Sequence, residues 1–177
     1  VDYIIFVSTT GLATPSIDAR LIGKLGFDPH IRRTPVWGLG CAGGAAGISH
    51  AYHHLLGHPR ERVLLIAVEL CSLTFHFSDF SKSNFVATAL FADGCAAVLM
   101  SGAEVGDDRG PAVLGTRSTT WPDSLDVMGW NFHNEGMQVV FSKAIPMIVM
   151  RKARENIGEF LKLHDLSIED IDRFIAH

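Results

Sequence analysis

The chain has 177 residues, of which 47% are hydrophobic and 19% charged, and its formal net charge at pH 7 is -4. This length and composition predict one globular domain of ordinary size and exclude a disordered chain. Lysine and arginine are scattered, which excludes a nucleic acid or an anionic membrane as an electrostatic partner and favours a small or acyl-type substrate.

Hydrophobic patterning predicts strands that alternate with helices over the first hundred residues. The predicted strands cover residues 3–8, 34–40, 62–70 and 95–101. The predicted helices cover residues 15–25 and 42–56, with a shorter one over 86–91. Because the strand over 3–8 is continuously apolar, we expect it to be covered on both faces. This order of elements indicates a layered α/β fold.

A cluster of Gly, Asp and Pro over residues 102–111 predicts a break in the chain. Beyond it, strands are predicted over 112–121, 126–132 and 137–142, followed by a long helix over 143–163. Ser167, with Glu169 and Asp170 behind it, predicts a capped short helix that leads into one more strand. We therefore expect this last strand to end at His177.

The three cysteines, Cys41, Cys71 and Cys95, match neither a zinc site nor a disulfide framework. They indicate a reducing compartment, and we expect Cys95 to be a core residue. No apolar run approaches the roughly 18 residues of a membrane span, so the sequence predicts a cytoplasmic protein without one. Because the chain begins inside a strand pattern and stops on an apolar run, we expect a segment of a longer chain.

Cys41 is a candidate nucleophile because it lies between a predicted strand and a helix rich in Gly and Ala. A thiol at a helix N-terminus faces unpaired N–H groups, which favour the thiolate. Gly40, Gly43 and the small residues after them permit a strained turn and close packing of helix on sheet. The alternative is that Cys41 is a small buried hydrophobe.

His177 is the second candidate because it follows the apolar residues 174–176. At the carboxyl end of a buried strand, a histidine reaches the cleft where ligands bind in open α/β sheets. In that cleft, His177 would form an ion pair with a thiolate or accept the proton of a thiol. The alternative is a histidine without a catalytic role. Seven others show no metal-ligand pattern: His30, His50, His53, His54, His58, His133 and His164.

Three motifs together resemble the type III polyketide synthases, the chalcone synthase-like branch of the thiolase superfamily. They are GLGCAGGAAG around Cys41, ALFADGCAAVL over 89–99 and RFIAH ending at His177. The segment MGWNFHNEGMQVVFSKAIP is similar to bacterial alkylpyrone-type members. The resemblance implies a thiolase-like fold, with residues 1–104 belonging to its N-terminal half and residues 105–177 beginning its C-terminal half.

The resemblance implies a decarboxylative Claisen condensation of malonyl-CoA onto an acyl-CoA starter, giving polyketides such as alkylpyrones or resorcinols. Cys41 would hold the growing chain as a thioester, and His177 would keep it ionised and stabilise the enolate oxyanion. The family's asparagine, its third catalytic residue, has no counterpart in this chain. The family uses no metal or organic cofactor and forms homodimers, although Thr14 replaces a methionine with which several members contact the neighbouring subunit.

Six further residues match family positions around the substrate. Phe91 matches a phenylalanine that gates the cleft, Phe132 resembles its partner, and such apolar walls exclude water. Thr9, Cys71 and Thr74 fall where members line the cavity. Glu69 matches an acid that some members link to the Thr9 position by hydrogen bonds. For Glu69 a structural role is the alternative, because a buried carboxylate needs partners, and core packing is the alternative for the two phenylalanines.

Two rival functions remain open at this point. A ketoacyl-ACP synthase III of fatty acid synthesis shares residues of the Cys41 and His177 type, although the LFADG and MGWNF segments and Phe91 favour a polyketide synthase. A thiolase-fold subunit that serves only as a non-catalytic dimer partner is the other alternative. Fast labelling of Cys41 by iodoacetamide would distinguish a thiolate from an inert cysteine.

Overall fold

The computed structural model describes residues 1–106 and 110–177, so the predicted break over 102–111 lies partly outside the described residues. The chain divides into two compact units. The first comprises 1–75 and 91–114, and the second comprises 76–90 and 115–177. None of the described helices is long and apolar enough to cross a membrane.

The first unit is built on a four-stranded sheet with the order β2-β1-β3-β4. β1 (Tyr3–Val7) lies between β2 (Arg32–Val36) and β3 (Arg62–Glu69) and is parallel to both. β4 (Gly94–Ser101) pairs antiparallel with β3 at one edge of the sheet. The carboxyl ends of the three parallel strands therefore meet at one edge, which we call the carboxyl edge.

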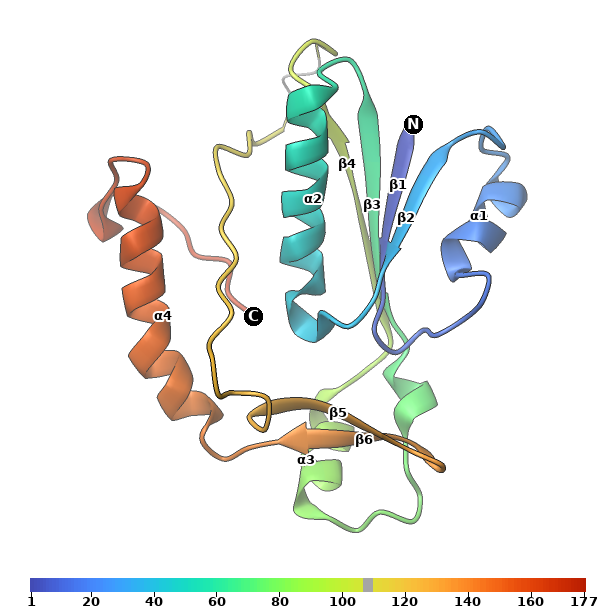
Figure 1. The fold of residues 1–177 in the computed structure, drawn as a ribbon, viewed down its shortest axis with the longest axis vertical. Coiled ribbons are helices and arrows are strands. Elements are labelled where there is room, and N and C mark those ends of the chain that lie inside the picture. Colours follow the sequence, from blue (N-terminus) through green and yellow to red (C-terminus); the bar gives the residue numbers. More distant parts are fainter. Residues whose placement is uncertain (107–109) are drawn as a thin grey trace. The chain divides into compact units, whose positions relative to one another are not determined.

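Two helices cover opposite faces of this sheet, as Figure 1 shows: α1 (Ile17–Leu25) on one side and α2 (Gly43–Gly57) on the other. Successive residues of a strand point to opposite faces, so β1 supplies both cores. On the α2 side, the buried residues are Ile5, Val7, Ala51, Leu55, Val63 and Leu65. On the α1 side, Ile17, Leu21 and Ile22 pack against the buried Ile4, Phe6 and Ile66. The expectation of a first strand covered on both faces is confirmed.

Glycines bring α2 close to the sheet. A Cβ atom added to Gly43 would lie 2.4 Å from Cγ1 of Val7, and one added to Gly47 would lie 2.4 Å from Cδ1 of Leu65. Real Cβ atoms essentially never approach other atoms this closely, so a larger residue at either position would force its neighbour to shift. Val7 has little freedom to do so, whereas the Leu65 methyl group is the end of a more flexible side chain. The predicted close packing of this helix on the sheet is confirmed.

The second unit contains the other regular elements: α3 (Lys82–Leu90), β5 (Met128–His133), β6 (Gly136–Phe141) and α4 (Ile145–Lys162). β5 and β6 form an antiparallel hairpin. Ser167 caps a short 3-10 helix, Ile168–Asp170, where its hydroxyl and its N–H both donate to the Asp170 carboxylate. This confirms the predicted cap.

Two predicted strands are absent from the described residues. Residues 112–121 and 171–177 have no regular secondary structure. A strand exists only where it pairs with a neighbour, and neither segment pairs with one here. The carbonyl of Leu114 instead accepts a hydrogen bond from the Tyr52 hydroxyl at 3.3 Å.

The prediction that Cys95 is a core residue is also wrong, because this cysteine is exposed. It lies on β4, opposite Val68 of β3. Most of β4 is exposed because it is an edge strand with little packed against it.

Candidate active site at the carboxyl edge of the sheet

The carboxyl edge brings together segments that are far apart in the sequence. Residues 8–11 follow β1, residues 37–42 follow β2, and residues 70–74 follow β3. In open α/β sheets, ligands bind in the crevice beyond the carboxyl ends of the strands. Of the predicted site residues, Thr9, Cys41, Glu69, Cys71 and Thr74 all lie at this edge.

Cys41 lies on a sharp turn between β2 and α2. Gly38 and Gly40 adopt positive φ angles of 88° and 51°, a conformation that costs glycine least. The chain then forms a short 3-10 turn over Gly40–Ala42, and α2 begins at Gly43. The Cys41 side chain is exposed, so in this chain it is not the small buried residue of the alternative interpretation.

The Glu69 carboxylate fixes the segment after β1. It accepts hydrogen bonds from the backbone N–H groups of Thr9 and Thr10, each at 2.9 Å, and a further one from the Thr10 hydroxyl. The Thr10 oxygen in turn accepts from the N–H of Leu70 at 2.7 Å. The structural role considered for Glu69 is therefore present, and the link to Thr9 runs through the main chain.

The Thr9 side chain connects this segment to the turn that carries Cys41. Its hydroxyl oxygen accepts a hydrogen bond from the N–H of Gly40 at 2.9 Å. Its carbonyl accepts one from the indole N–H of Trp37 at 3.0 Å. A continuous chain of hydrogen bonds therefore links Glu69 to the residue that precedes Cys41.

Cys71 and Thr74 share a single 3-10 turn, Cys71–Thr74. The Thr74 hydroxyl donates to the Cys71 carbonyl at 2.8 Å. Burial raises the pKa of the Cys71 thiol, and the negative charges of Glu69 and Asp93 together with the nearby Cys41 raise it further. Cys71 therefore presents a neutral thiol at this edge.

Phe91 directly follows α3 and is partly buried. Two residues later, the Asp93 carboxylate accepts hydrogen bonds from the N–H and the hydroxyl of Ser72, both at 2.8 Å. These two bonds lower the pKa of Asp93. The segment that carries Phe91 is thereby joined to the turn that carries Cys71.

Thr10, Ser72 and Asp93 also belong to this network, although no sequence pattern predicts them as site residues. Asp93 lies in a turn-like Ala-Asp-Gly sequence, but nothing local indicates a partner 21 residues away. Thr10 is likewise bonded to Glu69 across 59 residues. Only the side-by-side pairing of strands brings these groups together.

Phe132 and His177 belong to the second unit. Phe132 lies on β5 with 54% of its surface exposed, and His177 is exposed in a segment that forms no strand. Because Cys41 lies in the first unit, its pairing with His177 stays a prediction.

The chain is similar to known polyketide synthases. Residues 1–104 match the N-terminal domain of chalcone and stilbene synthases. The chain is 46% identical to a Bacillus subtilis protein with a provisional chalcone synthase name, and 42% identical to the 1,3,6,8-tetrahydroxynaphthalene synthase of Streptomyces peucetius. Each similarity covers 100% of this chain, but 50% and 47% of the relative.

The fold is similar to that of a solved relative. The crystal structure of 1,3,6,8-tetrahydroxynaphthalene synthase from Streptomyces coelicolor, a bacterial type III polyketide synthase, matches with a TM-score of 0.90 at 30% identity. The match covers 100% of this chain and 50% of that one. The chain thus spans about half the length of the relatives it matches, and the predicted thiolase-like α/β fold is confirmed.

Proposed function

The chain belongs to the chalcone and stilbene synthase family, the type III polyketide synthases, and we propose that its protein condenses malonyl-CoA with an acyl-CoA starter. The condensation is decarboxylative and proceeds through a thioester on Cys41. Relatives named for tetrahydroxynaphthalene and alpha-pyrone synthesis support a polyketide product. We propose an alkylpyrone or a resorcinol.

The observation that carries this proposal is the exposed thiol of Cys41 on the turn between β2 and α2. A thiolate there attacks the carbonyl of the starter, forms the thioester and releases the coenzyme A thiol. The N-terminus of α2 favours negative charge close to this sulfur. The hydrogen bond from Gly40 to the Thr9 hydroxyl holds the turn in place.

His177 is the proposed partner of Cys41. Its imidazolium would pair with the thiolate before loading. It would then donate a hydrogen bond to the thioester carbonyl of malonyl-CoA as carbon dioxide leaves. Charge develops on that oxygen when the enolate forms, so a fixed donor lowers the barrier. The enolate carbon then attacks the Cys41 thioester and extends the chain by two carbons.

The remaining residues are proposed to shape the cavity. Phe91 and Phe132 would exclude water, which otherwise protonates the enolate or hydrolyses the thioester. Thr9, Cys71 and Thr74 would line the space for the growing chain. The neutral thiol of Cys71 suits an apolar acyl chain, and Glu69 would keep the Thr9 segment in position.

The organisation of the whole protein is also proposed from the family. Residues 1–104 would belong to the N-terminal thiolase-like half and residues 105–177 would begin the C-terminal half. The protein would act as a cytoplasmic homodimer. Family membership and the named relatives support a polyketide synthase over a ketoacyl-ACP synthase III or a non-catalytic subunit.

Replacement of the nucleophile in the full-length protein tests this proposal. We expect Cys41→Ala to reduce extension of acyl-CoA starters by at least about 10³-fold, because no thioester forms. Product masses after incubation with malonyl-CoA and acyl-CoAs of increasing length give the measurement and the preferred starter. Cys95→Ala is the matched control and should retain activity. Unchanged extension by Cys41→Ala, or extension from malonyl-ACP alone, would contradict the proposal.

A further inference from the structure

A second cluster of chemically active side chains lies far from Cys41. His54 and His58 are four residues apart near the end of α2, and Glu61 immediately precedes β3. One ligand atom from each of the three residues lies within 4.8 Å of the others. Among residues 1–106 and 110–177, no other three His, Cys, Asp or Glu side chains gather in this way. The spacing of these histidines in the sequence shows no metal-ligand pattern, and Glu61 joins two of them only in the folded chain.

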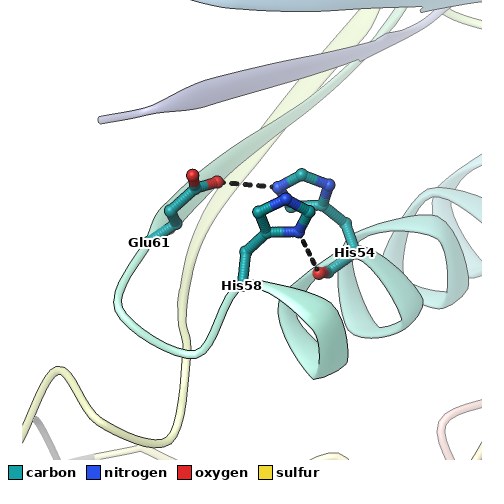
Figure 2. A group of neighbouring side chains, drawn as sticks. All are labelled: His54, His58 and Glu61. Carbon is teal, nitrogen blue, oxygen red and sulfur yellow. Dashed lines mark hydrogen bonds and ion pairs between the residues drawn. The ribbon is translucent and has the colours of Figure 1, made fainter.

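Figure 2 shows how the three side chains lie. The two imidazole rings are stacked, with their centroids 4.2 Å apart and their planes 6° from parallel. Nε2 of His54 lies 2.8 Å from Oε2 of Glu61. Nδ1 of His58 lies 3.1 Å from the carbonyl oxygen of His54. The cluster thus holds three potential ligands on one helix end and the turn after it.

The backbone contact determines which nitrogen of His58 is available. A carbonyl oxygen only accepts hydrogen bonds, so Nδ1 of His58 carries the proton. In the neutral ring, Nε2 then presents a lone pair. Metal-binding histidines commonly donate their other N–H to a backbone carbonyl in this way, which orients the ring.

We propose that His54, His58 and Glu61 form a binding site for a divalent transition metal ion such as Zn²⁺. Two imidazoles and one carboxylate are ligands that zinc accepts, with a water molecule completing the tetrahedron. The ion would take the place of the proton between His54 and Glu61. In neutral His54 this proton moves to Nδ1, so that Nε2 is free to coordinate.

Metal binding requires the two rings to move, because stacked rings with planes 6° apart do not direct both lone pairs at one ion. Zinc bonds to nitrogen and oxygen are about 2.0–2.2 Å long, so the ligand atoms must come closer together than 4.8 Å. Because His58 is exposed, its ring has room to leave the stack with His54 and to turn its Nε2 toward the other two ligands. The guanidinium of Arg32 also contacts Oε2 of Glu61 and competes with the ion. Because 48% of the Arg32 side chain is exposed, it has room to turn toward solvent.

The site lies opposite the proposed active site. α2 runs antiparallel to the parallel strands, so it begins at the carboxyl edge and ends at their amino ends. Its 15 residues span roughly 20 Å. A bound ion would therefore join the end of α2 to the start of β3 without touching the substrate. We expect it to stabilise the fold and to have no part in the condensation.

Metal affinity of the full-length protein with alkylated cysteines tests the proposal, because exposed thiols also bind zinc. We expect His58→Ala to weaken Zn²⁺ binding by at least about tenfold in competition with a chromogenic chelator. His53→Ala is the matched control: its Nδ1 contacts the Ser49 carbonyl at 2.8 Å, yet it lies outside the cluster. Equal zinc affinity of the wild type and His58→Ala would overturn the proposal. Glu61→Gln provides a second variant if His58→Ala does not fold.

Arg32→Gln separates a metal site from an ordinary ion-pair cluster. Removing the competing positive charge should tighten Zn²⁺ binding by about tenfold, whereas a purely structural cluster predicts no gain. Zinc should also raise the melting temperature of the wild type more than that of His58→Ala, because a ligand stabilises the state that it binds. If Arg32→Gln does not bind Zn²⁺ more tightly and zinc raises both melting temperatures equally, the proposal of a metal site is wrong.

Discussion

Cys71 and Cys41 both lie at the carboxyl edge of the sheet, but their surroundings differ. Cys71 is partly buried, and burial is the main cause of its raised pKa. The carboxylates of Glu69 and Asp93 act in the same direction because they disfavour a second negative charge. Cys41 is exposed. The two thiols are therefore suited to different roles: Cys71 to a cavity wall and Cys41 to nucleophilic attack.

This difference predicts the order in which iodoacetamide modifies the thiols. Only the thiolate reacts, and a raised pKa lowers its fraction at a given pH. We expect Cys41 to be alkylated well before Cys71 at pH 7, and Cys71 to react appreciably only as the pH rises above the ordinary range for a thiol. Peptide mass spectrometry after timed quenching gives both rates.

Asp93→Asn provides the variant for the same measurement. It removes one negative charge near Cys71 and retains an oxygen that accepts a hydrogen bond from Ser72. Alkylation of Cys71 should become faster, while that of Cys41 should change little. If Cys71 reacts as fast as Cys41 in the unmodified protein at pH 7, the assignment of a neutral thiol is wrong.

At the scale of elements, the contact of α2 with the sheet depends on individual glycines. Gly43 is the first residue of α2 and faces Cγ1 of Val7 on β1. Valine is branched at Cβ and has little freedom to rotate away. At Gly44, the next residue, no atom beyond the chain neighbours and the local helix backbone lies within 4 Å of the position that a Cβ would take. A methyl group therefore fits at Gly44 but collides with Val7 at Gly43, although both glycines lie in the same helical turn.

We expect Gly43→Ala to destabilise the protein by about 1–3 kcal/mol, because the added methyl group overpacks the contact with Val7. Gly44→Ala should be neutral or should stabilise it by up to about 1 kcal/mol, because alanine favours a helix more than glycine does. Denaturant unfolding of both variants measures the difference. Equal stability of the two variants would contradict the close packing of α2 on β1.

The elements that the sequence predicted well are those with a local cause. The apolar pattern located β1, β3, β4, α2 and α4 to within a few residues. The strand predicted over 34–40 is instead Arg32–Val36, because the positive φ angles of Gly38 and Gly40 interrupt an extended chain. The strand predicted over 112–121 is absent because a strand needs a partner, which no local pattern reveals.

The same distinction applies to the candidate site. Cys41 was predicted from its position between a strand and a helix, and Thr9, Glu69 and Cys71 from a family resemblance. Asp93 was not predicted as a partner of Ser72, because their contact depends on the pairing of β3 with β4. The pairing of Cys41 with His177 stays a prediction.

At the scale of the whole chain, many large apolar side chains are exposed. Leu114, Leu125 and Met150 have exposed fractions of 77%, 96% and 81%. On β4, Val98 and Leu99 are 42% and 50% exposed at the edge of the sheet. Apolar surface and an unpaired strand edge together favour association with other chains. The chain also spans only about half the length of the relatives that it matches.

We therefore expect the 177-residue chain, expressed alone, to bind a hydrophobic fluorescent dye and to self-associate. The full-length protein should bind severalfold less dye per mole, because the remainder of the protein or a second copy covers part of this surface. Dye fluorescence and sedimentation velocity at several protein concentrations measure both properties. In the isolated chain, Leu99→Lys on β4 should reduce self-association if this edge takes part. A monomeric chain whose dye fluorescence does not exceed that of the full-length protein would show that these exposed side chains need no cover.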